Sequence, residues 1–438
     1  MIRQQKQFKE GAASFFIVAI STMILMIIVT SFAAIMISEI TRSSNDDLSQ
    51  SAYDSAMAGV EDAKLAFANY RKCLESGATA DRPSNYEAQP TCDNIVWMME
   101  RENTRCDMVA YILGRVKDAD GSVPVSDKSG DTKSNYNQAY TCVTMEGNLT
   151  NYRASLDSTT SEKIVKVSLD DSVAASRIKK VRIKWYSQRG GETYNYTNFS
   201  NNKVVFSPTS LSSASVPPTL QVQLIQTAGT FSISHFEAVD VGGNKTDRAT
   251  MYLVPTDNAG AAKATNADSY KGIYNGSANV LSAAQVVSTN NRDSKNLPFV
   301  VYCSGADDYA CVVDILLPDP IGGARSSKTF LFVVTTPYGQ PATDFEMEFY
   351  CADNDVCSRQ LDLATGTEKD SSIANLKGMQ VNVDSTGRAN DLYRRVEVRL
   401  EATNTSFKFP MYGIQLLNSS NGDNNLDKNF SVQKEWNF

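Results

Sequence analysis

An uninterrupted apolar segment near the start of the chain constrains the fold most strongly. Residues 11–38, GAASFFIVAISTMILMIIVTSFAAIMIS, carry no charged side chain, and their only polar side chains are short hydroxyls. At a helical rise of about 1.5 Å per residue, this segment is longer than the roughly 30 Å hydrocarbon core of a bilayer. We therefore expect residues 12–40 to form a transmembrane helix.

The charges on either side of this segment predict its orientation. Arg3, Lys6 and Lys9 precede it, and Asp46 and Asp47 follow it. Basic residues favour the cytoplasmic side of a membrane-spanning helix. We therefore expect a single-pass protein of the cytoplasmic membrane, with its N-terminus in the cytoplasm and its C-terminal domain outside.

A cleaved secretory signal peptide is the alternative interpretation, because Ser31 and Ala33 supply small residues that could precede a cleavage site. The apolar region of such a signal commonly has about 7 to 15 residues. The segment here is longer, and its helical pattern continues past any such site. Both features favour an uncleaved membrane helix.

The helical pattern continues through residues 41–74, where it becomes amphipathic. Apolar side chains recur there at spacings of three and four: Leu48, Ala52, Ala56, Val60, Ala63, Phe67, Tyr70 and Leu74. No proline interrupts residues 12–74, and Gly59 is their only glycine. The pattern predicts one continuous helix, half in lipid and half docked on a soluble domain. A coiled coil is the alternative, but alanine dominates the apolar face and the repeat covers few heptads.

The first 75 residues resemble a known family. A short basic leader ends in Lys9-Glu10-Gly11, Ala12 follows at once, and the apolar helix leads into the alanine-rich segment AYDSAMAGVEDAKLAF. These features resemble the N-terminus of type IV pilins, and most of all the larger minor pilins and pseudopilins. The resemblance implies that residues 1–11 are a prepilin-type leader, that a prepilin peptidase cleaves after Gly11, and that the new N-terminus at Ala12 is methylated.

The same resemblance implies partners and a place in a filament. Other pilin subunits would contact the N-terminal helix, and an inner-membrane assembly platform would extract it from the membrane. The family carries an acidic residue at the fifth mature position, where this chain has Phe16. A charge in an apolar filament core is costly unless it is paired, and Phe16 offers no partner to a neighbouring amine. We therefore expect a low-copy subunit or one at the filament tip.

Eight cysteines, all C-terminal to the apolar segment, form an even set that favours an oxidising exterior. Two pairs are close in sequence and predict disulfides that close short loops: Cys303 with Cys311, and Cys351 with Cys357. Four cysteines remain, with three possible connectivities: Cys73, Cys92, Cys106 and Cys142. A zinc site is the alternative, but the sequence has no CxxC pair, and its single histidine, His235, lies far from the cysteines.

Residues 75–160 and 161–438 differ in pattern. The first segment contains a predicted helix over 95–116 and is expected to be a cysteine-bearing insertion packed against the helical rod. From residue 162 onward, short segments with a period of two alternate with turn-forming residues, which predicts a β-rich extracytoplasmic domain. Within it, MQVNVDS and YRRVEVRLEA predict a hairpin with a longer loop over 386–391.

Together these elements predict an α+β fold. We expect a pilin-like arrangement, in which a long N-terminal helix with a transmembrane half and an amphipathic half packs on a disulfide-containing antiparallel β-rich domain. The sheet supplies the apolar surface that the amphipathic half of the helix needs.

The sequence carries few signs of catalysis. The motifs G-x-S-x-G, GxxxxGK[ST], HExxH and GxGxxG are absent. His235 lies in a strand-like stretch, where a structural role is more common than a catalytic one. We therefore expect a protein that is not an enzyme.

A net charge of −7 and an isoelectric point near 5.1 argue against general nucleic-acid binding. Lys180, Arg182 and Lys184 alternate with apolar residues and so share one face of a strand. DNA binding by this face is the alternative to a solvated face on an edge strand, where lysines oppose aggregation. We favour the solvated face and predict no specific nucleic-acid partner.

A calcium loop is the remaining candidate site. Asp423, Asn425 and Asp427 match the opening of an oxygen-ligand calcium loop, but Lys428 replaces its turn glycine and Lys434 stands where a glutamate would close it. A plain turn rich in Asn and Asp is the alternative that we favour. We expect no other cofactor.

Two functions are compatible with these features. The first is a structural minor pilin-like subunit of a type IV pilus or related filament, contributing to assembly and surface contact. The second is a membrane-anchored adhesin whose β domain binds a surface ligand without entering a filament. Processing distinguishes them, because the first predicts a mature N-terminus at Ala12 and the second an intact Met1.

Overall fold

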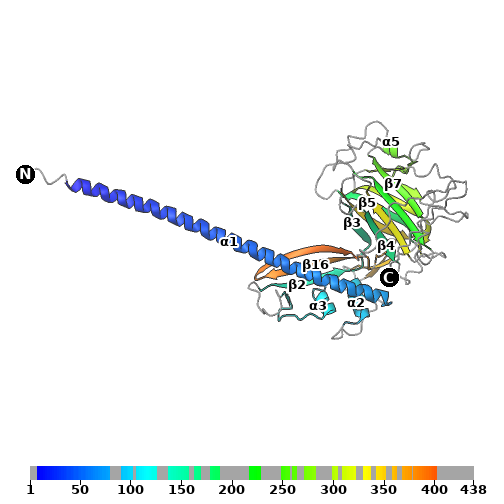
Figure 1. The fold of residues 1–438 in the computed structure, drawn as a ribbon, viewed down its shortest axis with the longest axis horizontal. Coiled ribbons are helices and arrows are strands. Elements are labelled where there is room, and N and C mark those ends of the chain that lie inside the picture. Colours follow the sequence, from blue (N-terminus) through cyan, green and yellow to red (C-terminus); the bar gives the residue numbers. More distant parts are fainter. Residues whose placement is uncertain are drawn as a thin grey trace, which may run out of the picture. The chain divides into compact units, whose positions relative to one another are not determined.

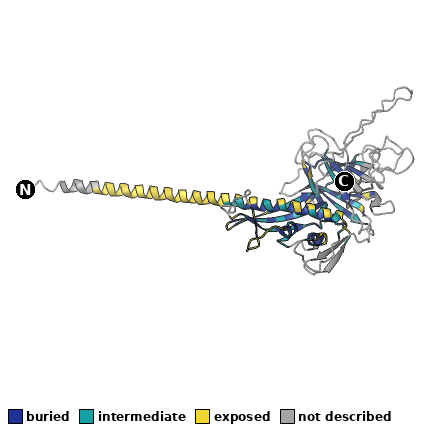
Figure 2. Cartoon of the chain, turned by 60° about the horizontal axis from the view of Figure 1, so that its bottom comes forward, coloured by how far each residue is buried: buried dark blue, intermediate teal, exposed yellow. Residues whose placement is uncertain are grey.

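The computed structural model describes residues 7–78, 90–101, 105–125, 137–156, 162–168, 178–187, 217–227, 248–256, 259–263, 271–282, 298–303, 308–321, 329–336, 342–351, 358–362, 367–376 and 378–401. Its first element is α1 (Gln7–Glu75), a single helix of 69 residues. Figure 2 shows the two halves of this helix: side chains from Phe15 to residue 47 are exposed, and one face is buried from Ala52 onward. The continuous helix predicted from the sequence is confirmed.

The buried face of α1 packs on a four-stranded antiparallel sheet (Figure 1). Its strands, in spatial order, are β1 (Val123–Pro124), β2 (Ala139–Glu146), β16 (Gln380–Ala389) and β17 (Leu392–Glu401). β2 and β16 are neighbours although they are distant in the sequence. The Thr141 hydroxyl, for example, donates a hydrogen bond to the carbonyl of Thr386, 245 positions away.

Two short helices, α2 (Cys92–Arg101) and α3 (Met108–Leu113), also contact α1 and β2. The prediction of one helix over 95–116 is wrong, because a turn at Cys106 and Asp107 separates α3 from α2. A disulfide to Cys142 and a 3.0 Å hydrogen bond from the Val143 N–H to the Cys106 carbonyl hold this turn against β2. We call α1 from Ala52 onward, α2, α3 and the four-stranded sheet the helix–sheet module.

The strands between β2 and β16 form a second body, which we call the sandwich. One sheet has the order β4 (Glu162–Ser168), β12 (Thr329–Thr335), β6 (Leu220–Thr227), β7 (Arg248–Thr256), β10 (Phe299–Tyr302) and β8 (Lys271–Gly272). The other has the order β3 (Asn151–Leu156), β13 (Thr343–Cys351), β5 (Ile178–Ser187), β11 (Tyr309–Ile321) and β9 (Val280–Ser282). A short helix, α5 (Ala259–Ala262), and a hairpin of β14 (Ser358–Asp362) and β15 (Thr367–Ser371) complete the described elements.

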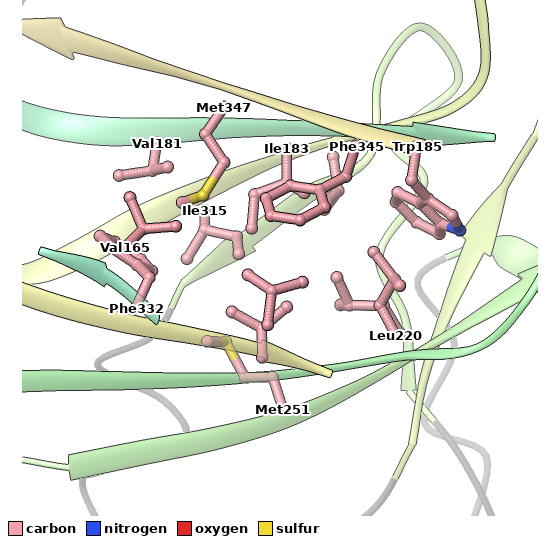
Figure 3. Close-up of a cluster of buried hydrophobic side chains, with 14 of the residues drawn as sticks. Val165, Val181, Ile183, Trp185, Leu220, Met251, Ile315, Phe332, Phe345 and Met347 are labelled. Carbon is pink, nitrogen blue, oxygen red and sulfur yellow. The ribbon is translucent and has the colours of Figure 1, made fainter. Parts of the chain in front are cut away.

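The two large sheets of the sandwich share one apolar core (Figure 3). Val181, Ile183 and Trp185 project from β5, while Val165 on β4 and Phe332 on β12 project from the other sheet. The period-two pattern of these strands places their alternate side chains in this core. Most strand pairs are antiparallel, as predicted, but β10 pairs in parallel with β7 and β8, and β11 with β9.

The predicted hairpin near the C-terminal end is confirmed, although its loop is shorter than predicted. β16 and β17 pair up to Ala389 and Leu392, so the turn contains only Asn390 and Asp391. Asn390 adopts a φ of 50°, a conformation that asparagine tolerates better than most residues. Residues 386–389, which were predicted to belong to the loop, continue the strand.

The strand pairing groups residues differently from the predicted segments 75–160 and 161–438. β2, from the first segment, shares a sheet with β16 and β17 from the second, while β3 belongs to the sandwich. Alternation of apolar side chains identifies a strand and its buried face, but it does not encode the neighbour with which the strand pairs.

The contact between α1 and β16 is unusually close. A Cβ atom at Gly387 would lie 2.1 Å from the backbone nitrogen of Ala56 and 2.2 Å from the carbonyl oxygen of Ala52. The buried Ser385 hydroxyl, two residues earlier on the same face, donates a 2.7 Å hydrogen bond to the Ala56 carbonyl. Small residues on both elements therefore let the helix backbone lie directly on the strand.

We predict that Gly387→Ala destabilises the protein by about 3 kcal/mol or more, because the added methyl meets helix backbone that cannot move aside like a flexible side chain. Glu397→Ala is the matched control, since Glu397 is exposed on the neighbouring strand β17. Urea unfolding in detergent measures both variants. Equal stabilities for the two variants would contradict the close packing.

Candidate functional site

The N-terminal half of α1 exposes most of the large apolar side chains that are exposed in the described chain. Among the described helices, α1 is the one long and apolar enough to cross a membrane, and no residue of its most apolar stretch is buried. Its exposed large side chains are Phe15, Phe16, Ile17, Val18, Ile20, Met23, Ile24, Leu25, Met26, Ile27, Ile28, Val29, Phe32, Ile35, Met36, Ile37 and Ile40. We call residues 15–40 the apolar segment. A continuous exposed apolar surface of this kind marks a contact with lipid or protein.

Four hydroxyls of the apolar segment donate hydrogen bonds to the backbone of their own helix. The hydroxyls of Ser21, Thr30 and Ser31 donate hydrogen bonds of 2.7–2.9 Å to the carbonyls four residues earlier. Thr22 donates to the carbonyl of Ala19 at 2.9 Å. Such bonding lowers the cost of placing a hydroxyl in an apolar medium, where no water can take its hydrogen bond.

The residues predicted to be processed lie in the first turns of α1. The backbone of Gly11 and Ala12 is helical. Phe16 is 64% exposed, and its ring lies edge-on to that of Phe15, with the ring centroids 6.4 Å apart. Phe16 is therefore an outward-facing part of the apolar segment.

A cluster of polar side chains joins the C-terminal half of α1 to the rest of the helix–sheet module. The sequence did not predict this cluster. The Arg115 guanidinium donates two hydrogen bonds to the Asp62 carboxylate, at 2.9 and 2.5 Å, and the Tyr140 hydroxyl donates a third at 2.8 Å. Burial and the neighbouring Asp62 carboxylate raise the pKa of Tyr140 above its ordinary value. The hydroxyl therefore stays protonated and remains a donor that joins β2 to α1. Spacing along the chain gave no signal for this cluster, because its members are distant in sequence.

The described cysteines form disulfides. The predicted pair Cys303–Cys311 is confirmed. The four cysteines with open connectivity pair as Cys73–Cys92, which joins α1 to α2, and Cys106–Cys142, which joins the start of α3 to β2. Cys351 is also disulfide-bonded, while Cys357 lies outside the described residues. Closure of a 36-residue separation by Cys106–Cys142 contributes about 4 kcal/mol in the chain-entropy description.

The basic strand is neither an edge strand nor an uncompensated charged face. β5 lies in the middle of its sheet, between β13 and β11. The Arg182 guanidinium donates hydrogen bonds of 2.6 and 2.9 Å to Asp314 on β11, and Lys184 lies 2.9 and 2.6 Å from the carboxylates of Glu346 and Glu348 on β13. The prediction of an edge strand is wrong, because β5 pairs with a strand on each side, and these strands supply the acids that pair with its bases: Asp314 for both Lys180 and Arg182, and Glu346 and Glu348 for Lys184.

These ion pairs are half-buried, and burial would normally disfavour the charged carboxylates. Burial raises the pKa of Asp314, but hydrogen bonds and charges from Arg182 and Lys180 outweigh it and hold that pKa below its ordinary value. The same balance holds for Glu346, with Lys184 and Arg153 as its partners. The alternation of acids in FEMEFYC, which matches the alternation of bases in KKVRIKWYS, is the sequence signal for this pairing.

The remaining candidate ligands are not brought together in the described chain. Within the residues that the structure describes, no group of three or more His, Cys, Asp or Glu side chains has the geometry to hold a metal ion. Asp423, Asn425 and Asp427 of the possible calcium loop lie outside the described residues, as does His235.

Comparison of the chain with protein-family models, with curated proteins and with solved structures finds no match. Its function therefore has to follow from its residues and their geometry.

We predict that acid destabilises the sandwich through Asp314. Its folded pKa lies below the unfolded value of about 4, so its contribution is present above that pH and is lost as pH falls through the lowered pKa. Asp314→Asn should lower the free energy of unfolding by about 2 kcal/mol at pH 7 and flatten its decline below pH 4. Fluorescence of the buried Trp185 during urea unfolding measures this, in a background carrying Trp97→Phe and Trp436→Phe.

Asp308→Asn is the control for this prediction, because Asp308 is exposed within the sandwich. An acid dependence that is equally steep in the wild type and in Asp314→Asn would show that the ion pair does not govern it.

Proposed function

We propose that the protein is a structural minor pilin-like subunit of a type IV pilus or related filament. One observation carries the proposal: a single unbroken helix is exposed over residues 15–40, where it is apolar apart from five hydroxyl residues and Glu39, and its second half packs on an antiparallel sheet. An apolar half-helix of this length suits a membrane before assembly and a bundle of like helices afterward. Because α1 is one continuous helix, packing of its second half on the sheet also determines the direction in which its apolar half extends.

The proposed route begins in the cytoplasmic membrane, with the C-terminal domain outside. A prepilin peptidase removes residues 1–11 and leaves Ala12 as the N-terminus, which is then methylated. An inner-membrane assembly platform extracts the subunit, and its apolar segment then contacts other pilin subunits. The disulfides of the described chain are compatible with an oxidising exterior, where such bonds persist.

A membrane-anchored adhesin is the second candidate. The observation that favours it is the sandwich, whose apolar core is separate from the core of the helix–sheet module. A protein that only anchors such a domain needs no filament. It would keep Met1, because no peptidase would need to act at Gly11.

Processing is tested at Gly11. We predict that wild-type protein from native membranes begins at Ala12, and that Gly11→Val stays full length, because a branched side chain obstructs a peptidase that reads a small residue. N-terminal sequencing and intact-mass measurement distinguish the two forms. Ala19→Val is the control, since it enlarges an exposed residue of the same helix and should be processed normally. Cleavage of Gly11→Val to the wild-type mass would exclude the pilin assignment.

The position in the filament is tested at Phe16. In a low-dielectric core, an unpaired charge is costly. With Phe16 in place of an acid, this subunit has no carboxylate for the N-terminal amine of one neighbour, while its own Ala12 amine can still pair with an acid of another neighbour. We predict a copy number far below that of the principal pilin in sheared filaments, measured by quantitative mass spectrometry. Phe16→Glu should raise this copy number, while Phe16→Leu should not. Immunogold labelling along the whole shaft would contradict a tip or low-copy subunit.

A further inference from the structure

The two bodies of the chain have separate apolar cores. Every member of the sandwich core lies between Tyr152 and Met379. Every member of the other core lies within residues 60–145 or 381–400, which belong to the helix–sheet module. Apolar burial is the main source of folding free energy, so each body has its own source of stability.

The two connections between the sandwich and the helix–sheet module lie side by side, although Leu376 and Met379 in the second connection still pack in the sandwich core. The N–H of Leu376 donates a 2.7 Å hydrogen bond to the carbonyl of Leu149, just before β3 begins. The three disulfides whose cysteines both lie in the described chain respect the same division. Cys303–Cys311 lies within the sandwich, and the other two lie within the helix–sheet module.

Within the part of the chain that the structure describes, polar side chains join the two bodies beyond this point, among them the ion pair of Lys163 on β4 with Glu401 on β17. The buried Gln380 side chain accepts from the Arg153 N–H at 2.9 Å and donates to the Arg153 carbonyl at 2.6 Å, as a neighbouring strand would. Arg399 donates to the Asn151 side chain at 2.8 Å, and Glu401 accepts from the Tyr152 hydroxyl. Hydrogen bonds of this kind fix register, but each contributes little net stability beside a buried apolar core.

We propose that the sandwich is an autonomous domain inserted at one point of the helix–sheet module, and that anchoring and assembly reside in α1 and that module, without the sandwich. Assembly then makes no use of the sandwich. The statement about assembly rests on the proposed pilin-like function, whereas the statement about folding does not.

Autonomous folding is tested on the full-length protein in detergent with a matched pair of variants. Val181 on β5 and Val381 on β16 are both fully buried, one in each core. We expect Val181→Ala to accelerate amide hydrogen exchange at least tenfold in peptides covering 178–187 and 309–321, and to leave peptides covering 139–146 and 380–401 within about twofold of wild type. Val381→Ala should produce the converse.

Acceleration of both bodies by either variant would overturn autonomous folding. The wild-type protein provides a measurement that does not depend on how well a variant folds. Exchange followed over increasing urea should give two separate opening transitions, one for each set of peptides, and a single shared transition would overturn the proposal.

The assembly statement is tested by replacing residues 150–375 with Gly-Gly. The Leu149–Leu376 hydrogen bond then becomes the i to i+3 bond of a β-turn, which two glycines can adopt. We expect this variant to form Cys73–Cys92 and Cys106–Cys142, as mapped by non-reducing peptide analysis, and to enter filaments at the wild-type copy number. A variant that lacks these disulfides overturns autonomous folding of the module.

A variant that forms both disulfides but is excluded from filaments overturns the assembly statement. If the wild-type protein itself is absent from filaments, the pilin-like function fails, while the exchange results still decide whether the sandwich is autonomous.

Discussion

The packing of α1 against β16 is the contact on which the rest of the structure depends. The backbones of Ala52 and Ala56 approach Gly387 so closely that no side chain would fit at position 387. The Ser385 hydroxyl adds a hydrogen bond to the helix backbone. This contact holds the second half of α1 in place. The first half then extends from a fixed support, with its apolar side chains exposed as one continuous surface.

The sequence predicted the features that depend on local pattern. The length of the apolar run and the spacing from Leu48 to Leu74 were sufficient for one long helix with two different halves. Proximity in the chain was sufficient for the Cys303–Cys311 disulfide. The break between α2 and α3 was missed, because it is imposed by a disulfide and a backbone hydrogen bond to β2. Helical periodicity alone carries no information about such tertiary contacts.

Features that depend on strand order could not be predicted in this way. The basic residues of β5 were expected at an edge, but β11 and β13 flank them and supply carboxylates at matching positions. The Asp62 cluster likewise joins residues from three parts of the chain. For the candidate site, the sequence predicted the exposed apolar helix, and the roles of Gly11, Ala12 and Phe16 stay predictions, while the polar contacts that support the helix emerged only from the fold.

The insertion of the sandwich between β2 and β16 has a consequence for the order of folding. The helix–sheet module cannot complete its sheet until the chain has been synthesised through β17, since Thr141 on β2 pairs with Thr386 on β16, 245 positions further along. A flexible loop of that length would make the encounter slow. A sandwich that folds first brings Leu149 and Leu376 together, and so turns a search over a long loop into a local hairpin-like closure. The sandwich would then act as an internal folding aid for the body that holds the membrane helix.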